Sequence, residues 1–476
     1  MGGGPAGLSL LTALRILFHR VSLRCIIANL ADAGSSPLTS HLRLALVESQ
    51  SLQPTRTWSL PPNKFSNRAS SLTRASVKFL EDIGAWKYIR HERVQPYHHM
   101  HVWDALSPKS KIDFEAERSA SDPNSVVASM TENQNLTQAL LTRLESLEPI
   151  SIIDNTSVAS IDLGPSPDSS ESLNLSSYPH IRLSSRASPL IARLLVGADG
   201  LNSPVRNFAR IPTRGWDYEK HGVVATVRLA SQDSSHLADG MAPEVQDNVT
   251  AYQRFLPSGP IALLALPGDY ASLVWSTTPE QAARLKALEA ADFVAMVNAA
   301  FRLSVVDVDY MSTMPSGQVD ELAWRLKATG ALADDERRYP RMVSSLQDGS
   351  VASFPLRMRQ ADQYVGERIA LVGDAAHTIH PLAGQGLNMG LADVASLVRT
   401  IKYSIRHGAD IGVYGNLAAY ESEMWMKNNR MLGVVDKLNK LYGVSWGPLV
   451  GLRSLGLGMV DKFDGAKGWI MAQAGG

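Results

Sequence analysis

The chain has 476 residues, more than one hydrophobic core usually supports, so we expect two or three domains. Its 46 Lys and Arg residues balance its 46 Asp and Glu residues, so no charge excess indicates binding to nucleic acid or to an anionic membrane. Cys25 is the single cysteine, which excludes an internal disulfide and a cysteine cluster for zinc or iron–sulfur. No apolar run reaches the roughly 18 to 20 residues of a membrane-spanning helix, so a globular enzyme is the default class.

A glycine-rich motif opens the chain. Gly2, Gly4 and Gly7 satisfy the pattern G-x-G-x-x-G, and the leucines at positions 8 to 14 form the apolar face of the helix that should follow. In dinucleotide-binding proteins such glycines turn the chain from a strand into a helix whose N-terminus holds a pyrophosphate. Met1 directly precedes the motif, so the sequence given has no first strand. A shortened start and a fortuitous match both remain open.

The next β-like run, residues 42–48, ends in Glu48, an acid that could bind the ribose of an adenosine. Glu48 lies 41 positions after Gly7 (48 − 7), about twice the usual spacing of roughly 20. Two explanations remain. One is an inserted segment at residues 16–33, such as a retained intron. The other is a lengthened first helix followed by a long loop.

Residues 67–72 are expected to lead into a helix that ends near Gly84, with Arg68 at its start. Arg68 is either a contact to the cofactor or a solvated arginine at a helix terminus. Residues 94–112 are predicted to form strands that contain three histidines, at positions 98, 99 and 101. Alternate residues of a strand face opposite ways, and no second ligand stands at helical i, i+4 spacing, so we expect no metal site.

The remaining elements alternate between helices and strands. We expect a helix over residues 131–144 and strands over 152–161 and 181–196, followed by antiparallel strands over 223–229 and 251–277. A helical region is predicted for residues 279–301 and an irregular excursion for 324–340. Two further helices are predicted over 392–407 and 420–441, and a glycine-rich tail with hydrophobic spacing over 446–471.

Two apolar strands end in acidic glycine turns. The first strand ends in Gly197-Ala198-Asp199-Gly200, and Ser203 and Arg206 follow at the start of a helix. The second ends in Gly373-Asp374, and a loop containing Pro381 leads to Gly384-Gln385-Gly386-Leu387-Asn388 at the start of another helix. Unpaired N–H groups and the positive end of the dipole at such a helix start suit an anionic or electron-rich ligand. Because Asp374 is placed to hold a sugar or ribityl hydroxyl, the pattern predicts a flavin site.

The order of these three landmarks, from the N-terminal glycines to Gly-Ala-Asp-Gly and then Gly-Asp-Ala-Ala-His, resembles the class A flavoprotein aromatic hydroxylases, whose fold is that of p-hydroxybenzoate hydroxylase. Within this superfamily, residues 100–104, 253–262 and 273–277 resemble the ubiquinone-biosynthesis group. The tail, residues 441–450 and 452–458, is similar to its mitochondrial eukaryotic member. The similarity covers nearly the whole chain.

This resemblance implies an α/β fold. A three-layer FAD-binding domain with a Rossmann-like parallel sheet would be combined with a mixed or antiparallel substrate sheet and C-terminal helices. The implied boundaries are residues 1–90, 128–212 and 356–410 for the FAD-binding domain, 91–127 and 213–355 for the substrate domain, and 411–476 for the C-terminal helical region.

The resemblance further implies FAD as the cofactor, with its pyrophosphate over the N-terminal glycines and its ring beside the helix start at Gly384. The implied cofactor-binding residues are Gly2, Gly4, Gly7, Glu48, Arg68, Asp199, Gly373, Asp374, Pro381, Gly384, Gly386, Leu387 and Asn388. No catalytic side chain can be assigned, because His377 and His380 are more simply explained by packing or hydrogen bonding. No metal is expected.

The implied activity is hydroxylation of a polyprenyl-4-hydroxybenzoate at ring carbon 5, by O₂ and reduced flavin through a C4a-hydroperoxide. The implied partners are a ferredoxin with its reductase as electron source and other ubiquinone-biosynthesis proteins in a complex. The implied location is peripheral, on the matrix side of the mitochondrial inner membrane. The alternatives are an NAD(P)H-dependent hydroxylase of another phenol, a flavin reductase of isoprenoid double bonds, and a truncated, inactive scaffold member of the complex.

Overall fold

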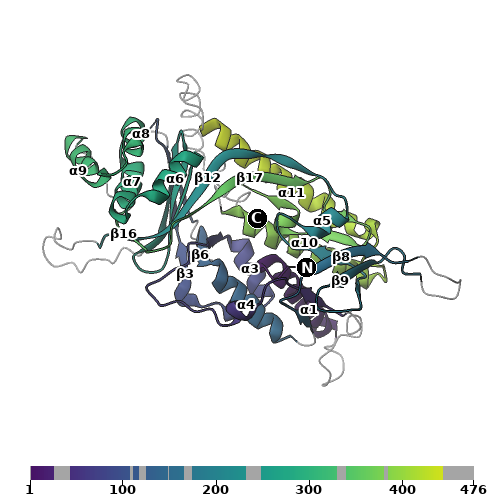
Figure 1. Ribbon diagram of the computed structural model, residues 1–476. Coiled ribbons are helices and arrows are strands. Elements are labelled where there is room, and N and C mark those ends of the chain that lie inside the picture. Colours follow the sequence, from purple (N-terminus) through teal and green to yellow (C-terminus); the bar gives the residue numbers. More distant parts are fainter. Residues whose placement is uncertain are drawn as a thin grey trace.

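The computed structural model describes residues 2–25, 43–107, 111–116, 125–147, 150–165, 174–231, 248–329, 339–379 and 384–442. Two large hydrophobic cores organise this part of the chain. One core lies under a long, mostly antiparallel sheet with α6, α7, α8 and α9 packed against it (Figure 1). The other is shared by α1, α4, α10 and short parallel strands. A large cavity is lined by residues of both bodies.

The large sheet is built from alternating strands that each bury one face. Its order is β20-β17-β12-β15-β14-β13-β4-β5, with β16 paired to β12, and the contact between β13 and β4 is parallel. The bounds are β4 His99–Asp104, β5 Lys111–Glu115, β12 Thr213–Leu229, β13 Thr250–Leu256, β14 Gly259–Ala265, β15 Tyr270–Thr277, β16 Val343–Leu346, β17 Ala352–Ala361 and β20 His377–Thr378.

Four helices cover one face of this sheet: α6 Pro279–Ala287, α7 Ala290–Arg302, α8 Val305–Thr313 and α9 Gln318–Thr329. Helix α7 is the central one, because Phe293, Val297 and Phe301 are almost completely buried. All four begin with a serine or threonine cap or with an acidic first turn, which stabilises the exposed backbone N–H groups there. The opposite face of the sheet lines the cavity described below.

The second body contains short strands in four groups. Strand β1 pairs with β7, β11 and β18 flank β19, β2 and β3 flank β6, and β8 and β10 flank β9. The bounds are β1 Ala45–Val47, β2 Ala69–Leu72, β3 Val94–Tyr97, β6 Ala128–Glu132, β7 Ser151–Ile153, β8 Val158–Leu163, β9 Pro179–Leu183, β10 Leu190–Ile191, β11 Leu195–Gly197, β18 Val365–Gly366 and β19 Ile369–Leu371.

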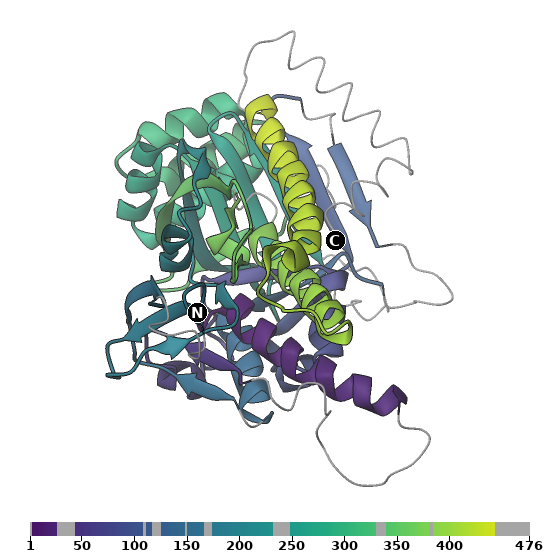
Figure 2. The same cartoon turned by 90° about the vertical axis from the view of Figure 1, so that its right-hand side faces the viewer.

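Seven helices pack around these strands: α1 Pro5–Cys25, α2 Gln53–Arg56, α3 Arg74–Asp82, α4 Asn133–Glu145, α5 Pro204–Phe208, α10 Gln385–Arg406 and α11 Tyr414–Tyr442. Helix α1 lies between α4 and α10. Its Leu8 is completely buried. Helix α11 packs on α10 and then runs past the large sheet, beside β4 and β5, which are the blue strands in Figure 2. The 3₁₀ turns are η1 Trp86–Tyr88, η2 His91–Arg93 and η4 Gly373–Ala375.

The parallel sheet is interrupted between β1 and β11. Both strands pair in parallel on one side, with β7 and β19 respectively, and they do not pair with each other. Gly2 lies between their carboxyl ends: its N–H donates to the Val47 carbonyl at 3.0 Å, and a Cβ added to it would lie 2.1 Å from the Ala198 carbonyl oxygen. Within the described residues, the loop before α1 therefore meets the ends of two strands that are not joined by a strand between them.

The structure corrects several sequence-based boundaries. Arg68 does not begin a helix but precedes strand β2, and α3 begins only after Thr73, whose hydroxyl oxygen accepts from the Ser76 N–H. The irregular excursion predicted from residue 324 is wrong as far as Thr329, because α9 continues to that residue. Residues 16–25, half of the suspected insertion, continue α1 as helix, whereas residues 26–42 lie outside the described residues. The tail 446–471 also lies outside them.

Candidate active site

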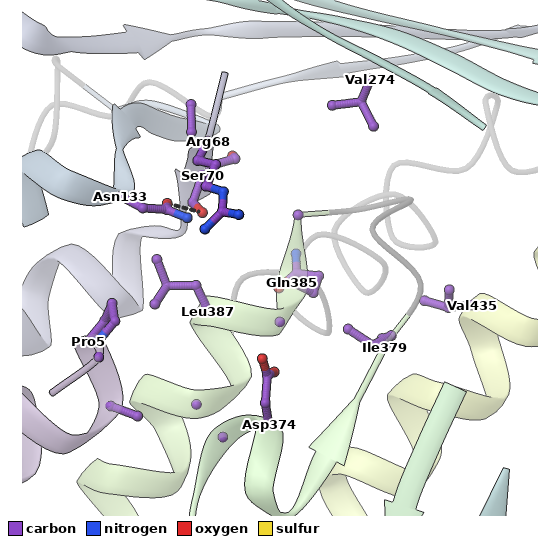
Figure 3. A pocket seen from close by; sticks show the side chains of 18 of the residues that line it. Pro5, Arg68, Ser70, Asn133, Val274, Asp374, Ile379, Gln385, Leu387 and Val435 are labelled. Carbon is purple, nitrogen blue, oxygen red and sulfur yellow. Dashed lines mark hydrogen bonds between the residues drawn. The ribbon is translucent and has the colours of Figure 1, made fainter. Parts of the chain in front are cut away.

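One large cavity, of about 2050 Å³, lies between the two bodies. Its wall contains the glycines before α1, the ends of β1 and β11, the Gly373-Asp374 turn, the start of α10, one face of the large sheet and part of α11. Figure 3 shows Arg68, Ser70 and Asn133 on one side of it, Asp374 and Leu387 below them, and Val274, Ile379 and Val435 farther along. The cavity is therefore polar at one end and apolar at the other.

Gly2, Gly4 and Gly7, at the start of α1, form what we call the glycine corner, which has open space beside one glycine and close packing at another. Gly4 lines the cavity, and a Cβ added there would meet nothing within 4 Å, so space for a ligand lies beside the start of α1. Gly7 does not line the cavity; a Cβ there would lie 1.9 Å from the Gly2 carbonyl oxygen, so only glycine permits this approach. Glu48 lines the same corner and accepts hydrogen bonds from the N–H groups of Gly3 and Gln50. Its carboxylate thus stabilises the loop around the corner.

The two acidic turns lie side by side. Arg206 joins them, because its guanidinium donates to the carbonyls of Leu201 and Ala375, at 2.6 Å and 2.8 Å. Asp199 accepts from the Val205 N–H through Oδ2, whereas its buried Oδ1 has no hydrogen-bond partner in the described residues. A buried carboxylate oxygen at the cavity wall needs a polar partner, which a bound hydroxyl group or a water molecule can supply. Asp199 therefore fits a polar ligand.

The Gly373-Asp374 turn is held by residues behind the cavity wall. Gly373 has a φ of +61°, which favours glycine, and its N–H donates to Asp393 at 2.9 Å. Asp374 projects from this turn into the cavity (Figure 3). Its carboxylate is accessible to solvent, yet desolvation by the surrounding protein raises its pKa above the ordinary value, and His377 partly opposes this rise. The carboxylate can therefore gain from hydrogen-bond donors on a ligand.

Helix α10 points its N-terminus at the cavity. Gly384, Gln385, Gly386 and Leu387 line the wall, and the Gly384 cap supplies no side-chain acceptor for the first N–H groups. Asn388 is buried instead: its Oδ1 accepts from the Thr73 N–H and the Ser76 hydroxyl, and its Nδ2 donates to the Ser71 carbonyl at 2.8 Å. Asn388 thus fastens the start of α10 to the β2–α3 segment, and it does not line the cavity.

Arg68 stands at the mouth of the polar end, where its exposed side chain points into the cavity (Figure 3). The loop before it is clamped by a buried ion pair between Arg93 and Glu132, whose atoms Nε and Oε2 are 2.5 Å apart. Glu132 also accepts from the Ser66 N–H at 2.6 Å. Across the cavity end, Ser70 donates to Asn133 at 2.6 Å. The loop is fixed, while the Arg68 head remains available to an anionic ligand.

The apolar end of the cavity lies between the large sheet and α11. Phe255 and Tyr442 stack there with ring centroids 3.9 Å apart, and they form a small cluster with Val102, Met100 and Phe114. These five residues also line the cavity. The arrangement offers an apolar arm that continues from the polar end. It can take an extended hydrocarbon group.

Most of the predicted site residues converge on this cavity. Those that line it are Gly2, Gly4, Glu48, Arg68, Asp199, Gly373, Asp374, Gly384, Gly386 and Leu387. Gly7 and Asn388 pack behind the wall, and Pro381 and His380 lie outside the described residues. No group of three or more possible metal ligands occurs in the described part of the chain. Sequence reasoning missed Asn133 and the α11 wall, because their roles depend on packing between distant segments, and it placed Asp393 at the end of the Gly373 motif without assigning it a role.

These positions fit an elongated ligand with an anionic middle. Two helix N-termini, those of α1 and α10, face the cavity and favour negative charge. Arg68 adds a cation, and Asp374 and Asp199 add hydrogen-bond acceptors for hydroxyl groups. A dinucleotide that ends in a flat redox ring fits this order of groups.

Comparisons with known proteins agree with this geometry. The family model described as an FAD binding domain matches residues 59–326 and 342–426, which is more than half of the chain. The ubiquinone biosynthesis monooxygenase COQ6 of Schizosaccharomyces pombe is 36% identical over 99% of this chain and 90% of its own length. The Saccharomyces cerevisiae protein of the same name is also 36% identical, over 100% and 93%. The human one is 37% identical over 86% and 82%.

Solved structures support the fold. The p-nitrophenol 4-monooxygenase PnpA of Pseudomonas putida superposes with a TM-score of 0.62 at 17% identity, covering 100% of this chain and 97% of that one. PqsL of Pseudomonas aeruginosa, a probable FAD-dependent monooxygenase, gives 0.59 at 17% identity over 93% and 95%. At this identity the likeness concerns the arrangement of helices and strands.

Proposed function

The chain belongs to the FAD binding domain family and to the family of ubiquinone biosynthesis monooxygenases, and from this premise we propose that it hydroxylates a polyprenyl-4-hydroxybenzoate at ring carbon 5. The observation that carries the proposal is the continuity of the cavity. A polar end with two helix N-termini leads directly into an apolar arm. One cavity can therefore hold a charged cofactor and a lipid-tailed phenol together.

FAD stores two electrons and activates O₂ when bound, and the chain supplies its position and surroundings. The start of α1 beside Gly4 would hold the pyrophosphate, with Arg68 as a further cation. Glu48 would bind the adenosine ribose, and Asp374 a ribityl hydroxyl. The backbone N–H groups at the start of α10 would stabilise negative charge on the ring without having to reorganise.

The phenol ring would lie where the polar end meets the apolar arm. Val274 from the sheet and Leu387 from α10 line the cavity on opposite sides of this region (Figure 3). Apolar walls exclude water, and this protects a reactive oxygen donor from wasteful breakdown. The prenyl tail would then extend along Phe255, Met100 and Phe114. This division of the cavity accounts for its polar and apolar halves.

Electrons would come from a ferredoxin and its reductase, and the chain would act in a complex of ubiquinone-biosynthesis proteins. Its relatives are named mitochondrial, and we propose a peripheral position on the matrix side of the inner membrane. Among the described residues, no helix is long and apolar enough to cross a membrane.

The test uses FAD-loaded protein, a prenylated 4-hydroxybenzoate, O₂ and a ferredoxin reducing system. We expect a product heavier by one oxygen atom, with the new hydroxyl at ring carbon 5 by NMR. The matched control reaction contains NADPH and no ferredoxin. Stoichiometric NADPH oxidation with a small soluble phenol would contradict the proposal and favour a hydroxylase of another substrate. Protein that purifies colourless and takes up no FAD would contradict it as well.

A further inference from the structure

Helix α11 carries an exposed stripe in which apolar and basic residues alternate. Met426, Arg430, Val434 and Lys437 follow one another at intervals of four, four and three residues, so they lie on one side of the helix. Met426 and Val434 are 50% and 47% exposed, and Arg430 and Lys437 are exposed as well. We call these four residues the α11 stripe. Apolar side chains of this size are usually covered when they recur along one side of a helix.

The α11 stripe borders the mouth of the cavity. Arg430, Val434 and Lys437 are exposed and also line the cavity, so they stand where it opens. Phe354 on β17 faces the same opening and is 40% exposed. Val435, the neighbour of Val434, lies on the apolar side of the cavity (Figure 3). The opening thus has an amphipathic rim beside the apolar arm.

The charged residues on this half of α11 are mostly basic. Between Met424 and Tyr442 the chain has four cations, Lys427, Arg430, Lys437 and Lys440, and a single acid, Asp436. Asp436 is buried and paired with Lys440 at 2.9 Å. The solvent-facing side of this segment is therefore basic. Basic side chains interleaved with apolar ones match an anionic lipid surface, where the cations meet headgroups and the apolar groups enter the interface.

We propose that the α11 stripe docks the protein on an anionic lipid bilayer, with the cavity mouth facing the lipid. The inference rests on the proposed function, because a prenylated substrate is dissolved in the bilayer and each methylene group exposed to water on the way to the enzyme costs free energy. A mouth that rests on the membrane lets the tail pass from lipid to the apolar arm without crossing water. An acidic redox protein is the competing occupant, but it would use only the basic side chains of the α11 stripe and would leave Met426, Val434 and the apolar arm unmatched.

The test is co-sedimentation of the purified full chain with vesicles of phosphatidylcholine, alone or mixed with phosphatidylglycerol. We expect binding only to the anionic vesicles, and weaker binding as salt rises. The double variant Arg430→Gln, Lys437→Gln should bind about 30-fold more weakly, because each cation near an anionic surface contributes roughly a fivefold factor. Val434→Ser should weaken the part of the vesicle binding that remains at high salt. The matched control, Lys286→Gln with Lys327→Gln on α6 and α9, removes the same charge from exposed sites and should bind as the wild type does.

Equal sedimentation with both kinds of vesicle, or an equal loss in the control, would overturn the inference. So would a double variant that keeps wild-type vesicle binding but no longer binds an acidic ferredoxin. A second assay separates this inference from the proposed function. The double variant should lower hydroxylation of vesicle-embedded long-tailed substrate by a larger factor than hydroxylation of a short-tailed substrate in detergent. If the wild type hydroxylates neither substrate, the proposed function fails while the vesicle result still decides the docking surface.

Discussion

His377 and Asp393, sixteen residues apart, form a pair that is shielded from solvent, with Nε2 and Oδ2 2.6 Å apart and exposed fractions of 1% and 0%. The same Oδ2 accepts from the Gly373 N–H, and Oδ1 accepts from Asn428 on α11 at 2.9 Å. One carboxylate therefore joins α10, α11 and the turn that presents Asp374. The sequence analysis explained His377 by packing or hydrogen bonding, and the structure places it in such a hydrogen bond.

We expect Asp393→Ala to lower the free energy of unfolding by about 3 to 5 kcal/mol, because it leaves a buried charge partner and a buried N–H unpaired. FAD affinity should fall too, since the Gly373 turn loses its anchor. Urea unfolding and flavin fluorescence titration measure the two effects. Asp82→Ala breaks the exposed pair with Lys78 and should cost less than about 1 kcal/mol. Similar costs for both variants would contradict the assigned role.

The same pair predicts a pH dependence. Burial opposes protonation of His377, but the negative charge and hydrogen bond of Asp393, together with the charge of Asp374, outweigh it, so the pKa of His377 is raised in the folded state. A raised pKa means that protonated His377 stabilises the fold below its unfolded value of about 6.5, and that this stabilisation is lost as the pH rises through the folded value. We expect the free energy of unfolding to decline on the alkaline side.

The measurement is urea unfolding at a series of pH values from about 6 to about 10. His377→Gln removes the titrating group and should flatten this part of the profile. Buried Tyr364 and Tyr420 lie close by, but their raised pKa values place their ionisation at higher pH. If the variant keeps the alkaline decline of the wild type, another group causes it.

We expect a substitution of Asp374 to weaken FAD binding without lowering the free energy of unfolding. Desolvation raises its pKa, so its charge costs stability in the absence of a ligand. We expect Asp374→Asn to leave the free energy of unfolding of the apoprotein unchanged or slightly increased. FAD should bind about 10- to 100-fold more weakly, because the hydrogen bond to a charged acceptor is lost. Equal FAD affinity in the variant and the wild type would remove Asp374 from the site.

Asn388 illustrates what the sequence could and could not predict. Its place in a glycine-rich helix start was visible, and so were the two strand-ended acidic turns, because local patterns encode local structure. Its hydrogen bonds to Ser71, Thr73 and Ser76 were not visible, because they join segments more than 300 positions apart. The role of α11 was hidden for the same reason. Sequence spacing therefore located the polar end of the cavity, whereas the apolar arm required the fold.

We expect Asn388→Ala to lower the free energy of unfolding by about 1 to 3 kcal/mol, because it leaves the Thr73 N–H and the Ser71 carbonyl without their partner. FAD affinity should fall less than in Asp374→Asn, since Asn388 acts through packing. Chemical unfolding and flavin titration of both variants test this order. A variant of normal stability that binds FAD poorly would instead make Asn388 a direct ligand.

The interruption between β1 and β11 leads to the last prediction. Gly2 contacts the carboxyl ends of both strands, so a strand placed directly before it would run parallel to both and could pair with each. A chain with about five β-branched residues fused immediately before Gly2 should therefore melt at a higher temperature and bind FAD more tightly. The control fusion has the same length but carries two prolines, which cannot donate to either neighbour. Calorimetry and flavin titration compare the two fusions. If the two fusions have the same melting temperature and FAD affinity, no strand can pair between β1 and β11. The glycine corner must then be organised by α1 and Glu48 alone.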